Sequence, residues 1–202
     1  MKHFNPNTNM LPITFPARPI NGGAFDPACP KVGPWFAEPK YNGWRALVHA
    51  PTGTIFNRHG AQLSIAAEFT AALAILAAHT TLAEWFDCEA LDRRHGRCRG
   101  TLVILDLIVP GVTYADRLSR RLASTLPIHA LTQDAAETVL LAPSYAGRDA
   151  AEVYADLQEA NRTLGCEFYE GLVMKQGGST YPIQRLSPDR TTPTWVKHRW
   201  HW

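Results

Sequence analysis

The residues best suited to chemistry begin with a lysine next to a turn sequence. Lys40 ends a β-rich run and directly precedes Asn42-Gly43, a dipeptide typical of two-residue hairpin turns with positive φ. Such a turn presents the amine at the rim of a sheet, where desolvation and neighbouring cations favour the neutral, nucleophilic form of a lysine. Taken alone, this segment indicates no more than a hairpin that carries a solvated lysine.

Two later strand-like runs carry charged side chains where a purely structural strand would hold apolar ones. Asp87 and Glu89 are two residues apart, so a strand would point both carboxylates to one face. Glu170 and Lys175 lie at the two ends of an apolar run. We expect these groups to serve a common site rather than to face solvent separately.

A pair of cations completes the reactive set. Lys197 and Arg199 share one face of a strand-like segment near the end of the chain, which suits them to a phosphate. A nucleophilic lysine, carboxylates for a hard divalent metal and cations for phosphate together describe nucleotidyl transfer.

Six short motifs follow one another between about residues 35 and 199. They are Lys40-Tyr41-Asn42-Gly43-x-Arg45, Asn57-Arg58-His59-Gly60, Asp87-Cys88-Glu89, Leu105-Asp106, Glu170-Gly171-Leu172-Val173-Met174-Lys175 and Trp195-Val196-Lys197. This order resembles the collinear motifs of the ATP-dependent DNA ligases. These belong to the covalent nucleotidyltransferase superfamily, which also holds RNA ligases and mRNA-capping enzymes.

The resemblance implies a role for each motif residue. Lys40 would attack the α-phosphorus of ATP, giving a lysyl-AMP intermediate and releasing pyrophosphate. Glu170 would hold Mg²⁺ or Mn²⁺, and Lys197 would neutralise the α-phosphate. The other implied nucleotide contacts are Glu38 at the adenine edge, Arg45 at the ribose or a phosphate, Arg58 at a phosphate, Glu89 at the ribose hydroxyls, Val173 and Leu105 on the two faces of the base, and Lys175.

Three positions depart from the family pattern. Asn42 stands where the family usually has Asp, Cys88 where it has Gly, and Leu105 where it has an aromatic ring. Leucine keeps apolar cover over the base but loses ring stacking worth about 0.5–1.5 kcal/mol. None of the three removes the nucleophile or the metal carboxylate.

The order of the predicted elements indicates an α+β fold. Strands are expected at 35–40, 44–49, 54–56, 82–91, 101–109, 167–176 and 194–200, and helices at 65–79, 116–123, 133–141 and 149–164. Without a strict βαβ order, we expect largely antiparallel sheets flanked by helices. The resemblance implies the DNA ligase/mRNA-capping nucleotidyltransferase fold, which is ATP-grasp-like.

The domain organisation follows from composition and motif positions. Residues 1–34 are rich in Asn, Pro and Gly, which predicts an extended leader, and 35–202 would form the nucleotidyltransferase (adenylation) domain. In DNA ligases an OB-fold follows the sixth motif, whereas this sequence stops at Trp202. We therefore expect no OB-fold, a partner protein as its possible source, and slow self-adenylylation.

Composition limits the class of protein. The 202 residues carry a net charge of +2, with 46% hydrophobic and 19% charged residues, which excludes disorder and a strongly basic nucleic-acid arm. No stretch approaches the ~20 apolar residues that span a bilayer, and no secretory signal is present. We expect a cytoplasmic monomer that does not bind membranes.

Arginines gather in two segments outside the motifs. The first segment would grip nucleic-acid phosphates, although a solvated hairpin tip is the simpler alternative. The second would form the polar face of a helix. The first contains Arg93, Arg94, Arg97 and Arg99, and the second contains Arg117, Arg120 and Arg121.

These observations predict an ATP-dependent DNA ligase that seals 5′-phosphate to 3′-hydroxyl ends of nicked or broken duplex DNA, as in DNA repair, replication or recombination. Two alternatives stay open. One is an RNA ligase or a capping-type guanylyltransferase, toward which Asn42 leans. The other is a catalytically degenerate module that binds nucleotide or DNA, which Leu105 and the early end of the sequence favour.

Overall fold

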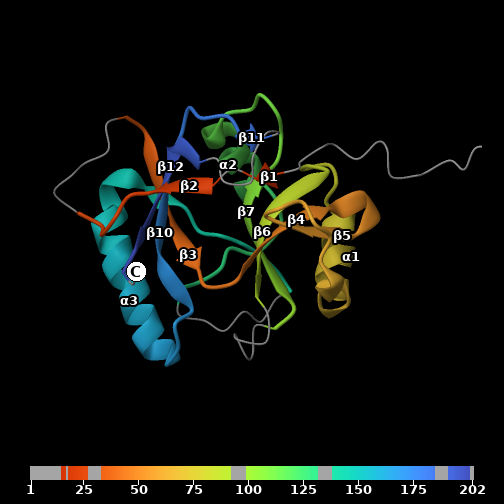
Figure 1. Ribbon diagram of the computed structural model, residues 1–202, viewed down its shortest axis with the longest axis horizontal. Helices are drawn as coiled ribbons and strands as arrows, with labels where there is room; N and C mark the ends of the chain where they lie inside the picture. The colour runs from red at the N-terminus through yellow and green to blue at the C-terminus, as the bar shows by residue number, and fades with distance from the viewer. Residues whose placement is uncertain are drawn as a thin grey trace, which may run out of the picture.

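Two mixed β-sheets of five strands each frame the protein (Figure 1). The structure is a computed structural model that describes residues 15–16, 18–26, 33–91, 99–131, 138–184 and 191–200. The first sheet has the strand order β2 (Arg18–Asn21), β12 (Thr191–Arg199), β10 (Tyr169–Gln176), β3 (Trp35–Tyr41) and β9 (Tyr145–Ala146). The second has the order β5 (Thr54–Asn57), β4 (Trp44–His49), β6 (Trp85–Leu91), β7 (Thr101–Leu107) and β8 (Val139–Leu141).

Strand direction differs at two sheet edges from the antiparallel pattern predicted. Among the described strands, β2 runs parallel to β12 and β8 runs parallel to β7, while the other pairs are antiparallel. A short antiparallel pair, β1 (Phe15–Pro16) with β11 (Ile183–Gln184), lies outside both sheets. The sheets are therefore mixed, and β2 shows that part of the expected leader is a strand.

Helices cover the sheets and bury their apolar faces (Figure 1). Helix α3 (Ala150–Leu164) packs against the first sheet through Val153 and Leu157, and Gly165 ends it at φ 67°. A glycine accommodates this left-handed conformation at a helix C-terminus. Helix α1 (Thr70–Ala78) follows a 3₁₀ segment, η2 (Ser64–Phe69), where one continuous helix was predicted, and packs on the second sheet. Helix α2 (Tyr114–Leu122) lies against β7.

The last three residues of the helix predicted at 133–141 form a strand instead. Val139–Leu141 forms β8, and 132–137 lie outside the described residues. All three residues of β8 are buried, and a short aliphatic run buried on both faces is typical of a parallel edge packed under other elements. Its apolar side chains fit a strand and a buried helix equally well, which is why the prediction failed.

The turn at Asn42-Gly43 links the two sheets instead of closing a hairpin. β3 belongs to the first sheet and β4 to the second, and neither turn residue has a positive φ. Glycine is required here by space, because a Cβ on Gly43 would lie 2.7 Å from both the Ala90 carbonyl oxygen and the Glu89 Cγ. The predicted hairpin is therefore wrong, but the turn carries the chain from Lys40 across the site to Arg45.

Candidate functional site

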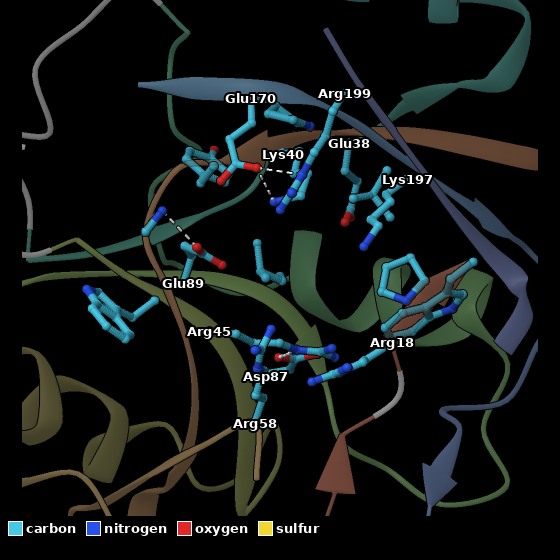
Figure 2. Close-up of a pocket in the computed structure, with 18 of the residues that line it drawn as sticks. Arg18, Glu38, Lys40, Arg45, Arg58, Asp87, Glu89, Glu170, Lys197 and Arg199 are labelled. Carbon is cyan, nitrogen blue, oxygen red and sulfur yellow. Dashed lines mark hydrogen bonds and ion pairs between the residues drawn. The ribbon is translucent and has the colours of Figure 1, made fainter. Parts of the chain in front are cut away.

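A pocket of about 450 Å³ opens between the two sheets (Figure 2). Strands β2, β3, β10 and β12 supply one wall, and β4, β5, β6 and β7 supply most of the other. Seven lysine and arginine side chains and four carboxylates are among the lining residues. Such a surplus of positive charge within a concave site attracts an anionic ligand.

The predicted nucleophile and the predicted metal carboxylate meet in this pocket. The Lys40 ammonium lies 2.9 Å from Oε2 of Glu170, with side-chain exposures of 17% and 24%. Arg199 Nε lies 2.7 Å from the same oxygen, so Glu170 bridges two cations (Figure 2). Lys40 and Glu170 are 130 positions apart in the sequence, and the direct pairing of β3 with β10 brings them into contact.

An irregularity in β10 accounts for the position of Glu170. The pairing of β10 with β3 shifts register between Tyr169 and Gly171, which leaves Glu170 without a partner on β3. Gly171 has φ +144°, and a Cβ there would lie 1.8 Å from the His198 carbonyl oxygen. Only glycine fits this close approach between β10 and β12, so Gly171 is what allows the bulge to form.

Asp87 and Glu89 share one face of β6, as the alternation predicted, but they have different hydrogen-bond partners. Asp87 accepts hydrogen bonds from Arg45 Nε at 2.9 Å and Nη2 at 2.6 Å, and from the Tyr181 hydroxyl at 2.9 Å. Glu89 accepts one from the Gly43 amide at 2.9 Å. Burial raises the pKa of Glu89 to about 7, against the opposing effects of Lys40 and the amide bond. Arg45 lines the pocket with its guanidinium committed to Asp87.

Under the pocket, Glu38 belongs to a buried ionic network. Its Oε1 accepts hydrogen bonds from the Tyr114 hydroxyl at 2.5 Å and from Arg121 Nη2 at 2.6 Å, and Lys175 Nζ lies 2.7 Å from its Oε2. Asp106 also belongs to this network, which ties β3, β7 and β10 to α2. The Glu38 and Lys175 side chains therefore reach the pocket as members of this network.

The arginines of α2 were predicted to form a polar outer face, and that prediction is wrong for two of them. Arg117 and Arg121 are 0% and 1% exposed, whereas Arg120 is exposed. Arg117 donates to Asp106 through Nε at 2.8 Å and Nη2 at 2.9 Å. The sequence spacing could have indicated their burial, because four residues recur at the i, i+3, i+4, i+7 interval of one helix face. These are Tyr114, Arg117, Leu118 and Arg121, and all four are buried.

The predicted cover for the base sits on an irregular strand. The pairing of β6 with β7 skips Leu105, which lies between partners of Asp87 and Cys88 and lines the pocket. Its carbonyl oxygen accepts hydrogen bonds from Lys175 Nζ at 2.8 Å and from Arg121 Nη1. The ionic network thus satisfies the backbone that the bulge leaves unpaired. Val173 lines the pocket from β10.

The other departures from the family pattern have local explanations. Asn42 donates from Nδ2 to the Glu167 carbonyl at 2.9 Å, a bond that an ionised aspartate could not donate. Cys88 points away from Asp87 and Glu89 into the apolar core of the second sheet, where burial raises its pKa well above the usual value. Neither residue changes the charged lining of the pocket.

The remaining predicted phosphate contacts are unequally placed. Lys197 lines the pocket, and its pKa is lowered by partial burial and by the charges of Arg199 and Lys40. Arg58 is an exposed lining residue whose Nε donates to His59 Nε2 at 3.0 Å. Arg99 is not a lining residue, and its Nε lies 3.3 Å from Glu68 Oε2. The other members of the arginine loop, Arg93, Arg94 and Arg97, lie outside the described residues.

Sequence reasoning missed one pocket arginine altogether and assigned another no separate role. Arg18 lines the pocket from β2, and Arg199 holds Glu170 from β12 (Figure 2). Arg18 lies in the segment predicted as a leader, outside all six motifs. The signal that could have found it is weak, since a lone arginine between prolines has no periodic partner.

The carboxylates suit a divalent cation only together with a ligand. Within the described residues, no group of three or more His, Cys, Asp or Glu side chains is arranged to hold a metal. Mg²⁺ commonly binds through one or two carboxylates plus substrate phosphates. Glu170 is a single carboxylate at the pocket wall, and both of its ion pairs engage Oε2. It therefore fits a site in which the nucleotide phosphates supply the other metal ligands.

Comparisons with known proteins identify the fold. No family model and no curated protein matches this sequence. The ligase domain of M. tuberculosis LigD superposes with a TM-score of 0.59 and 22% identity, over 92% of this chain and 59% of that one. Chlorella virus DNA ligase-adenylate gives 0.55 and 13%, over 93% and 67%. An archaeal ATP-dependent RNA ligase gives 0.50 and 15%, over 90% and 48%.

These likenesses show the fold that the six motifs predicted. The chain has the fold of the nucleotidyltransferase domain of ATP-dependent DNA ligases. It spans 59% of the length of the LigD ligase domain. Among the described residues, no helix has the length and apolar character needed to cross a bilayer.

Proposed function

We propose that this protein is an ATP-dependent polynucleotide ligase of the DNA ligase type. One observation carries the proposal: Lys40 enters a cation-rich pocket in contact with Glu170, within the ligase fold. The first step would join Lys40 Nζ to the α-phosphorus of ATP and release pyrophosphate. The AMP would then pass to a 5′-phosphate end, and a 3′-hydroxyl would displace it to seal the strand.

Nucleotide binding would use both walls of the pocket. Val173 on β10 and Leu105 on β7 come from opposite sheets, so an adenine between them would be covered on both faces. Glu38 and its backbone would meet the adenine edge, held rigid by the ionic network. Glu89 would accept from a ribose hydroxyl, and we assign phosphate contacts to Arg58.

The cationic side chains of the pocket would stabilise the negative charge that develops during the transfer step. Lys40 must give up a proton to solvent before its lone pair can attack the α-phosphorus. As charge builds on the α-phosphate, Lys197 lies within the pocket to neutralise it. Preorganised cations of this kind supply several kcal/mol of transition-state stabilisation, in sites where the removal of one donor costs about 10²–10³ in rate.

A divalent cation fits beside Glu170. We propose that this carboxylate holds Mg²⁺ or Mn²⁺ together with the phosphates of the nucleotide. The metal would neutralise phosphate charge, which a single lysine cannot do alone. Before nucleotide binds, Glu170 is paired with Lys40 and Arg199. The metal would replace these two cations on the carboxylate when it binds with the nucleotide.

The polymer substrate we propose is nicked or broken duplex DNA, and RNA is the alternative that the likeness to an archaeal RNA ligase favours. Incubation with α-labelled ATP and Mg²⁺, followed by nicked DNA or nicked RNA, tests both. We expect an acid-labile adduct that disappears in Lys40→Ala and persists in Arg120→Ala, a surface variant on α2. A wild-type protein that forms no adduct at high ATP would contradict the enzyme assignment and favour a nucleotide-binding module.

A further inference from the structure

Arg18 occupies the pocket from outside the six motifs. It begins β2, which runs parallel to β12, with Arg18 opposite Thr191 and Asn21 opposite Lys197. β2 therefore sends Arg18 into the same cavity that β12 lines with Lys197 and Arg199. The Gly22 amide donates to the Lys197 carbonyl at 2.9 Å and fastens the end of β2 to β12.

The charge on Arg18 acts on Lys197, which lines the same pocket. Partial burial and the charges of Arg199, Lys40 and Arg18 together lower the pKa of Lys197. Cations that repel one another in a shared cavity are stabilised by a ligand that carries several negative charges. With seven cations against four carboxylates in the lining, one monoanionic phosphate would not balance the pocket, whereas a polyphosphate would.

The position of Arg18 relative to Lys40 decides which phosphates it can reach. Figure 2 shows Lys40 beside Glu170 at one side of the pocket and Arg18 reaching in from the other, toward Arg45 and Asp87. Phosphoryl transfer places the attacking atom and the leaving group roughly in line on opposite sides of the phosphorus. A nucleotide attacked by Lys40 would therefore direct its β- and γ-phosphates away from Lys40, into the part of the pocket where Arg18 lies.

We propose that Arg18 binds the β- and γ-phosphates of the nucleotide and stabilises pyrophosphate as it leaves. This assignment rests on the proposed function. The neutral Lys40 nitrogen forms a bond to the α-phosphorus while the bond from that phosphorus to the bridging oxygen breaks. The bonding pair leaves on pyrophosphate, and the amine proton passes to solvent. The planar guanidinium of Arg18 can meet two phosphate oxygens at once as this charge develops.

Binding measurements with two unreactive probes test the assignment. Inorganic pyrophosphate represents the leaving group, and AMP has the nucleoside and α-phosphate without it. Neither probe alone can form lysyl-AMP. By calorimetry, Arg18→Gln is expected to weaken pyrophosphate binding by about 10-fold and to leave AMP binding unchanged. Arg18→Lys is expected to restore part of the loss, and Arg120→Gln, an exposed arginine outside the pocket, is expected to match the wild type.

Kinetics supply the second measurement. Arg18→Gln is expected to slow lysyl-AMP formation about 10- to 100-fold and to raise the pyrophosphate concentration needed to reverse it. Equal pyrophosphate binding in Arg18→Gln and wild type would overturn the assignment, and so would a parallel loss of pyrophosphate and AMP binding. A wild type that binds pyrophosphate through Arg18 but forms no adduct would instead refute the proposed ligase activity, so the two failures are distinguishable.

Discussion

Arg121→Leu should destabilise the protein strongly, because it breaks the buried network beneath the pocket. Arg121 is 1% exposed and donates to Glu38 Oε1 at 2.6 Å, to the Ala142 carbonyl at 3.3 Å and to the Leu105 carbonyl. Removal of one partner of a buried ion pair costs about 3–5 kcal/mol. Each buried carbonyl left unsatisfied costs about 1–3 kcal/mol, but Lys175 continues to serve both Glu38 and Leu105. We therefore expect a loss of about 3–5 kcal/mol.

Urea unfolding followed by circular dichroism measures this loss, and the same helix offers a matched control. Arg120→Leu changes an exposed residue next in sequence and should alter the free energy of unfolding by less than about 0.5 kcal/mol. In a double-mutant cycle, Arg121→Leu and Glu38→Gln should show a coupling energy above about 1 kcal/mol. A loss below about 1 kcal/mol for Arg121→Leu, or no coupling to Glu38, would refute the assignment of a structural ionic network.

Three further predictions concern the strands that line the pocket. Gly171→Ala should destabilise by about 3 kcal/mol or more, since its Cβ would lie 1.8 Å from the His198 carbonyl oxygen, while Gly178→Ala has open space and should be near neutral in thermal unfolding. Burial raises the pKa of Glu89 from 4.5 to about 7, so the folded state binds the extra proton. The wild type should lose stability relative to Glu89→Gln as pH rises from about 4.5 to 7, by up to ~3 kcal/mol, and parallel pH curves would contradict this. Leu105→Phe should add base stacking worth about 0.5–1.5 kcal/mol and lower the KM for ATP, and an unchanged KM would place the base elsewhere.

Motif order and strand alternation predicted the centre of the site. Lys40, Glu170 and Lys197 line one pocket, and Asp87 and Glu89 share a face of β6. Alternation succeeds here because a strand fixes side-chain direction at every second residue. The ligase-type fold was implied by the resemblance of the six motifs to those of the DNA ligases, and the solved structures that superpose on this chain share that fold.

Longer-range features could not be read from the pattern. Helical spacing placed Arg117 and Arg121 on one face but did not say that this face turns inward, because the partner of Arg121 is Glu38, 83 residues away. Asn42-Gly43 has the composition of a hairpin turn, yet β3 and β4 pair with strands of different sheets. Arg18 enters the pocket only because β2 pairs with β12 from the far end of the chain.

The most direct test of the central claim is intact-mass and peptide mass spectrometry of the protein after incubation with ATP and Mg²⁺. A covalent nucleotidyltransferase should gain the mass of one AMP, located on the peptide that contains Lys40, and should lose it again when pyrophosphate is added. Lys40→Ala should gain nothing while it keeps the fold. An unmodified wild-type protein, or an adduct on a residue other than Lys40, would contradict the account.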